Sequence, residues 1–155
     1  MTTQLSTSVI LQAYEVRLHY KRPLFNTMAH ITSAKEAHLF LRSHVNSEQL
    51  DLREHFWVIL LTNANRVLGF SKVASGTSRG VQTNIKYIFQ VALRSNASAI
   101  ILAHNHPSGI LQISECDIRE TNKIKELANF LDITLLDHVI LTSESYVSLA
   151  EEDKI

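Results

Sequence analysis

Two histidines, a serine and an aspartate between positions 104 and 117 have side chains that can bind a metal ion or support one. His104 and His106 end an apolar run that predicts a buried strand, and a turn with proline and glycine follows them. Side chains two positions apart on a strand share a face, so both imidazoles can point at one ion. Ser114 and Asp117 then open a segment of helical periodicity, which places Asp117 in its first turn. The pattern predicts a metal site where a strand ends and a helix begins.

These ligand types suit zinc, which binds imidazole nitrogen and carboxylate oxygen. Three protein ligands leave a fourth position for water, and such an open position is typical of a catalytic site. A structural site would normally be closed by four protein ligands, often thiolates, but Cys116 is the only cysteine of the chain. We interpret Cys116 as a packing or incidental residue and expect a catalytic zinc site with about one zinc ion per chain.

Each part of this pattern also has an explanation that involves no metal. A His-x-His pair at the end of a strand is most often exposed or hydrogen-bonded. Ser114 with Asp117 suits a helix N-terminus, because the hydroxyl caps a backbone amide and the carboxylate interacts favourably with the helix dipole. Capping leaves the two histidines unexplained beside the same turn, so the combination favours a metal site.

The elements that position these residues alternate between strands and helices. Ser33 and Glu36 are spaced as a capping box for a helix that ends near residue 44, and the stretch 9–20 is apolar and β-branched enough for a strand. From residue 56 the predicted order is strand 56–62, strand 66–73, a loop at 76–80, helix 84–95, strand 98–104, helix 114–131, strand 133–142 and strand 145–149. Strands separated by helices, with one hairpin, predict a three-layer α/β sandwich with a mixed sheet.

Composition limits the function classes. The chain has 155 residues, 45% of them hydrophobic, and we expect residues 1–49 to form an N-terminal extension packed on a domain of residues 50–155. Fifteen basic and fifteen acidic residues leave no net charge, which argues against a nonspecific nucleic-acid binder, although local patches stay open. The sequence shows no membrane span or targeting segment, and one cysteine cannot form an internal disulfide, so we expect a cytoplasmic protein.

The spacing of His104, His106, Ser114 and Asp117 resembles the motif of the JAMM (JAB/MPN+) zinc metallohydrolases. Further blocks at 53–61, 96–109 and 135–141 resemble the RadC branch of that superfamily, and the resemblance runs from about residue 53 to residue 149. Longer RadC relatives carry a helix-hairpin-helix region before this domain. Residues 1–52 show nothing like its glycine hairpins, so the chain resembles a short form of the family.

The resemblance implies a role for each site residue. His104, His106 and Asp117 would bind zinc, and Glu54 would act as the general base on a water molecule at the metal. Ser114 would stabilise the oxyanion that forms at the attacked carbonyl. The implied fold is a cytidine-deaminase-like sandwich, and the implied activity is hydrolysis of peptide or isopeptide bonds in an unknown protein or peptide substrate.

Other function classes fit less well. A noncatalytic RadC-like module that acts in DNA repair or mobile-element biology through binding is the main alternative, but the neutral charge weighs against a nucleic-acid partner. The letters His-Asn-His also suggest a nuclease class, yet there the three residues are spread along a ββα element. A zinc deaminase would need His-x-Glu and Pro-Cys-x-x-Cys, which this chain lacks.

Neighbouring polar and apolar residues have open roles. Alternation in the run 135–141 puts His138 and Asp137 on opposite faces. We predict that His138 is a core histidine or supports a metal ligand, and that Asp137 is a hydrogen-bonding group at a strand edge. Asn105 either shapes the turn or contacts substrate. The loop 109–113 is apolar and forms either a rim beside the metal or a packed layer under the loop.

Overall fold

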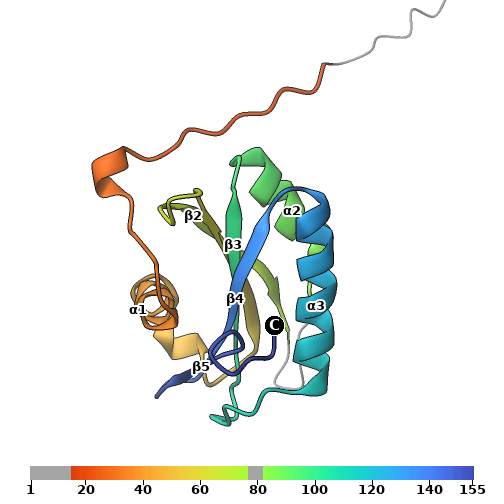
Figure 1. Cartoon of the computed structure of the whole chain (residues 1–155). Coiled ribbons are helices and arrows are strands. Elements are labelled where there is room, and N and C mark those ends of the chain that lie inside the picture. The colour runs from red at the N-terminus through yellow and green to blue at the C-terminus, as the bar shows by residue number, and fades with distance from the viewer. Residues whose placement is uncertain (1–14, 77–81) are drawn as a thin grey trace, which may run out of the picture.

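The computed structural model describes residues 15–76 and 82–155, which form an α/β sandwich of three layers (Figure 1). Within these residues one mixed sheet has a helix on one face and two helices on the other. Its strands are β1 (His55–Leu61), β2 (Val67–Ser75), β3 (Ala99–Asn105), β4 (Thr134–Leu141) and β5 (Tyr146–Ser148). The helices are α1 (Ala34–His44), α2 (Ile85–Arg94) and α3 (Glu115–Phe130), with short 3₁₀ turns at Phe25–Thr27 and Ser47–Gln49. The predicted fold class is confirmed.

The strand order β2-β1-β3-β4-β5 places β3, the strand that leads to both histidines, at the centre of the sheet. β1 runs antiparallel to both β2 and β3, whereas β3 and β4 are parallel and are joined through α3. A parallel pair needs such a crossover, and it brings the carboxyl ends of β3 and β4 to the same edge of the sheet. The start of α3 therefore lies near the end of β3, where the histidines are.

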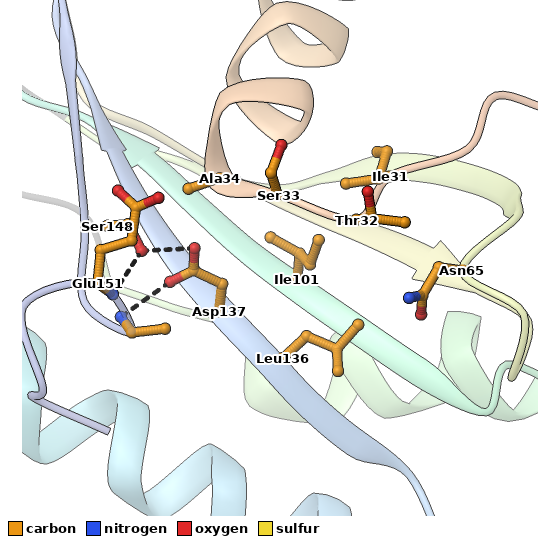
Figure 2. A pocket seen from close by; sticks show the side chains of 11 residues that line it. Ile31, Thr32, Ser33, Ala34, Asn65, Ile101, Leu136, Asp137, Ser148 and Glu151 are labelled. Carbon is orange, nitrogen blue, oxygen red and sulfur yellow. Dashed lines mark hydrogen bonds between the residues drawn. The ribbon is translucent and has the colours of Figure 1, made fainter.

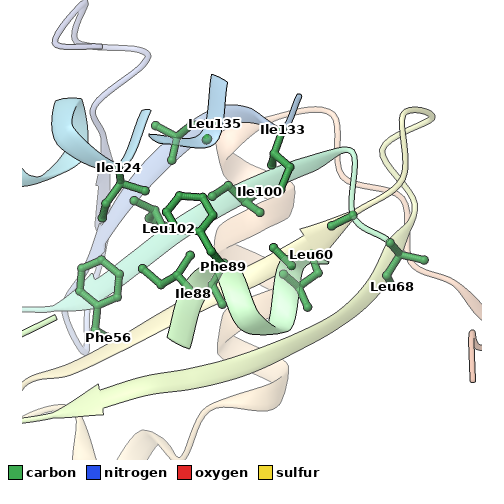
Figure 3. Packing of buried hydrophobic residues seen from close by; sticks show 14 of the residues in the cluster. Phe56, Leu60, Leu68, Ile88, Phe89, Ile100, Leu102, Ile124, Ile133 and Leu135 are labelled. Atoms are coloured by element: carbon green, nitrogen blue, oxygen red, sulfur yellow. The ribbon is translucent and has the colours of Figure 1, made fainter. Parts of the chain in front are cut away.

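β3 is buried on both faces, and its apolar residues alternate between two cores. Ile100 and Leu102 pack against Ile88 of α2 and Ile124 of α3 (Figure 3). Ile101 faces the other way, into the core that α1 covers. Each such side chain contributes roughly 1.5–3 kcal/mol on full burial, so this strand is a rigid base for the polar residues at its end.

Helix N-termini follow the capping signals of the sequence. Ser33 accepts a hydrogen bond from the amide of Glu36 (3.2 Å), as the predicted capping box requires. The Glu36 carboxylate turns to the amide of Thr32 (2.6 Å), one residue before the cap. Asn84 caps α2 by accepting from the amide of Tyr87 (3.0 Å). The predicted elements from residue 56 onward agree with the structure to within two residues at each end.

The predicted strand at 9–20 is wrong for residues 15–20, which have no regular secondary structure. This stretch is exposed and is held by isolated contacts, such as Tyr20 Oη donating to the Leu68 carbonyl (2.6 Å) and Arg94 Nε donating to the His19 carbonyl (2.7 Å). A strand needs a continuous ladder to a neighbour, which single side-chain bonds do not supply. Residues 9–14, and most of the loop predicted at 76–80, lie outside the described residues. No helix in the described part of the chain combines the length and apolar character needed to cross a bilayer.

Candidate metal centre

His104, His106 and Asp117 come together at the end of β3, as the sequence predicts. The two Nε2 atoms are 3.0 Å apart, and Asp117 Oδ1 is 3.4 Å from His104 Nε2. One ligand atom from each residue lies within 4.8 Å of the other two. Two ring nitrogens and one carboxylate oxygen therefore converge on a single point.

The ring of His106 is oriented by the turn that follows it. Its Nδ1 lies 2.8 Å from the carbonyl oxygen of Ile110. A carbonyl only accepts, so the Nδ1 of the neutral ring carries the hydrogen and Nε2 keeps its lone pair. Gly109, with φ of 78°, lets the turn close in this way, because most other residues are strained at positive φ. The Ile110 side chain is 60% exposed, so it does not pack under the loop.

Asp117 caps α3 and faces the histidines at the same time. Its Oδ2 accepts from the amide (2.8 Å) and the hydroxyl (2.6 Å) of Ser114, and Ser114 Oγ accepts from the Asp117 amide (3.1 Å). This reciprocal capping box uses one carboxylate oxygen and leaves Oδ1 directed at His104. One oxygen of the carboxylate thus serves in helix capping while the other stays available for a metal ion, and Ser114 orients the Asp117 side chain.

His104 is buried and is held in place by two rings. Its Nδ1 is 2.7 Å from Nε2 of His138, and the Phe56 ring stacks parallel to it at 5.9 Å between centroids. Burial lowers the pKa of His104 to about 4, although the Asp117 carboxylate opposes that shift. Burial also holds the pKa of His138 well below its ordinary value. Both rings are therefore neutral at physiological pH, as a metal ligand and its supporting group should be.

Glu54 lies just before β1, half-buried and on the metal side of the sheet by the alternation that directs Phe56 there. Burial raises the pKa of its carboxyl group, nearby His106 opposes this shift, and the Asp117 and Glu120 carboxylates add to it. Glu54 is thus close enough to the site to interact with its charges. Among the described residues, the cluster that could hold an ion consists of the two histidines and Asp117 without Glu54.

Asn105, between the two histidines, fixes the backbone on both sides of Glu54. It faces away from the histidines and is completely buried. Its Oδ1 accepts from the amide of His55 (2.7 Å), and its Nδ2 donates to the carbonyls of Leu50 (2.7 Å) and Arg53 (2.9 Å). Neither role expected from the sequence describes this contact. The sequence does contain a signal for these bonds: Asn105 belongs to a buried strand, and a buried side-chain amide must find hydrogen-bond partners.

A pocket of about 450 Å³ lies on the opposite face of the sheet, between the start of α1 and strands β3 and β4 (Figure 2). Ile101 lines it, and Asp137 reaches its edge. The Asp137 carboxylate accepts from Ser148 Oγ (2.7 Å) and from the Ala150 amide (3.1 Å), so it fixes the segment after β5. Since His104 faces the other side of the sheet, this pocket is separate from the metal centre.

Comparisons with known proteins cover most of the chain. A family model described as the RadC-like JAB domain matches residues 31–154, which include every predicted site residue. The UPF0758 protein of Flavobacterium johnsoniae is 35% identical over 122 residues, or 79% of this chain and 52% of that relative. The chain therefore spans about half the length of this curated relative.

Changing Asn105 to aspartate should destabilise the fold strongly. The substitution removes the Nδ2 hydrogens that satisfy Leu50 and Arg53 and buries a negative charge beside their carbonyls. Since one unsatisfied buried group costs about 1–3 kcal/mol, we expect the free energy of unfolding to fall by more than about 2 kcal/mol in chemical denaturation. The same change at exposed Asn122 is the matched control and should have an effect within about 0.5 kcal/mol. Equal losses of unfolding free energy at the two positions would show that the hydrogen bonds of Asn105 do not stabilise the fold.

The metal-free protein should lose stability as the pH falls from 6.5 towards 4. In this window an unfolded histidine binds a proton, whereas folded His104, with its pKa lowered to about 4, does not. The unfolded state thus binds more protons, and stability rises with pH; His138 adds to the same slope because its pKa is also lowered. Denaturation midpoints measured between pH ~5 and ~7 test this. A midpoint that stays constant, or rises on acidification, would contradict neutral burial of these rings.

Proposed function

Because the chain belongs to the RadC-like JAB domain family, we propose that it is a zinc-dependent hydrolase of amide bonds, acting on peptide or isopeptide linkages. The observation that carries the proposal is the convergence of His104 Nε2, His106 Nε2 and Asp117 Oδ1. The remaining donor and acceptor atoms of these side chains are hydrogen-bonded within the protein. The side chains are thus oriented for a ligand in advance of its binding.

The donor set fits zinc. Two neutral imidazole nitrogens and one carboxylate oxygen are ligands that zinc binds readily, and a set of three leaves a position open for water or substrate. Cys116 is exposed and stands outside the converging atoms, so the proposed set contains no thiolate. A zinc ion held here would lower the pKa of a bound water to about 7 and polarise the substrate carbonyl.

Glu54 would move the protons of the reaction. Its carboxylate accepts a proton as the water oxygen bonds to the carbonyl carbon, and it returns that proton to the amine nitrogen as the C–N bond breaks. The pKa of Glu54 is raised by burial, which brings it closer to neutral pH and makes the carboxylate a stronger base in the first step.

Ser114 can stabilise the oxyanion without releasing Asp117. Its hydroxyl and its amide both donate to Asp117 Oδ2. When the hydroxyl turns towards the carbonyl oxygen of a substrate, the amide keeps the carboxylate in place. Donors of this kind contribute because they are already oriented when negative charge develops.

Glu54→Gln should retain zinc and the fold but lose turnover by about 10²- to 10⁴-fold, because the amide cannot accept the proton of water. The measurement is cleavage by zinc-loaded protein of internally quenched peptides and of peptides joined through a lysine Nε. Glu120→Gln is the matched control, since Glu120 is a neighbouring, partly buried carboxylate to which the mechanism gives no role. It should keep most of the turnover.

Two results would contradict parts of this proposal. One is equal turnover in Glu54→Gln and the unchanged protein, which would show hydrolysis without Glu54 as the general base. The other is a cellular phenotype that survives Glu54→Gln but disappears in His106→Ala, which would give the metal a structural or ligand-binding role. In that case the domain acts as a noncatalytic binding module.

A further inference from the structure

A chain of buried hydrogen bonds leads from His104 through β4 into α3 and back to the residue that carries the carboxylate ligand. His104 Nδ1 is 2.7 Å from His138 Nε2, and His138 Nδ1 is 2.6 Å from Thr121 Oγ1. Thr121 Oγ1 is 2.5 Å from the backbone carbonyl oxygen of Asp117. His138 is 1% exposed and Thr121 is fully buried, so water does not compete for these bonds.

The backbone carbonyl sets the direction of every bond in the chain. It can only accept, so the single hydroxyl hydrogen of Thr121 points at Asp117. Thr121 Oγ1 must then accept from His138, whose Nδ1 carries the hydrogen. A neutral imidazole has one N–H, so His138 Nε2 offers a lone pair to the Nδ1 hydrogen of His104. His104 Nε2 is left with a free lone pair, directed at His106 and Asp117.

An irregularity in β4 directs His138 to the metal side. In the β3–β4 register Ile100 pairs with Leu135, but the next residue, Ile101, pairs with Asp137, so Leu136 is an extra residue. Leu135 belongs to the core under α2 and α3. Without the bulge, strict alternation from Leu135 would turn His138 to the face covered by α1. Bulges often re-aim side chains beside functional sites, and here the bulge supplies the ring that contacts His104.

We propose that His138 and Thr121 are positioning residues that hold His104 in the tautomer whose Nε2 binds the metal. This inference rests on the proposed metal site and adds two residues to it. Metal-binding histidines usually donate their second N–H to a carboxylate, a carbonyl or water. Here the imidazole of His138 takes that place, and its own tautomer is fixed through Thr121 by the backbone carbonyl of Asp117. No net charge is buried under the site in this arrangement.

Thr121→Val tests the relay at the residue that does not touch His104. Valine cannot accept the Nδ1 hydrogen of His138, so His138 should move its hydrogen to Nε2 and donate to His104 Nδ1. His104 would then carry its own hydrogen on Nε2, where the metal must bind. We expect zinc affinity, measured by competition with a chelator, to fall about 10- to 100-fold, the loss typical when a supporting partner of a ligand is removed. Thr121→Ser keeps the hydroxyl and should restore affinity to within about threefold of the unchanged protein.

Nitrogen NMR of ¹⁵N-histidine-labelled, metal-free protein at pH ~8 gives a readout that packing alone does not move. In the unchanged protein both His104 and His138 should carry their hydrogen on Nδ1, and in Thr121→Val both should carry it on Nε2. An Nε2 hydrogen on His104 in the unchanged protein overturns the proposal, and so does Thr121→Val with unchanged zinc affinity. If Thr121→Val does not fold, the tautomers of the unchanged protein decide. Failure of the unchanged protein to bind zinc would refute the proposed function instead, since the tautomers are measured without metal.

Discussion

The carboxyl end of β3 buries polar side chains on both faces of the sheet, and the surrounding elements supply their hydrogen-bond partners. A buried donor or acceptor without a partner costs about 1–3 kcal/mol, so these positions constrain what can pack around them. His104 faces α2 and α3 and bonds to His138, whereas Asn105 faces α1 and bonds to the segment before β1. One strand end thus positions the proposed metal ligands on one face and the backbone around Glu54 on the other.

The sheet topology makes this arrangement possible. The antiparallel pairing of β1 with β3 sets Phe56 opposite His104. Glu54, two positions before Phe56, therefore lies at the level of the site. The parallel pairing of β3 with β4, joined through α3, brings His138 and the first turn of α3 to the same place. A shift of either register by one residue would turn these side chains to the other face, so the site depends on the pairing of all three strands.

Local signals in the sequence were enough to predict most of the helices and strands and three residues of the candidate site. The elements from β1 onward follow from hydrophobic periodicity and capping residues, and the converging ligands follow from a two-residue spacing on a strand plus a carboxylate in the next helical turn. The position of Glu54 came from family resemblance alone, because a contact between residues so far apart in the chain leaves no local pattern. The bulge at Leu136, the partners of Asn105 and the Ile110 carbonyl that orients His106 also depend on tertiary packing. The stretch 15–20 has strand-forming residues but no neighbouring strand to pair with among the described residues.

X-ray absorption spectroscopy at the zinc edge tests the central claim most directly. Protein loaded with about one zinc ion per chain should show four nitrogen or oxygen neighbours at ~2.0–2.1 Å, with the multiple-scattering signal of two imidazoles. Replacing His106 with alanine should remove one imidazole from that signal. A sulfur neighbour at ~2.3 Å would place Cys116 in the site. A spectrum without imidazole scattering would mean that zinc binds elsewhere, and either result would contradict a centre built from His104, His106 and Asp117.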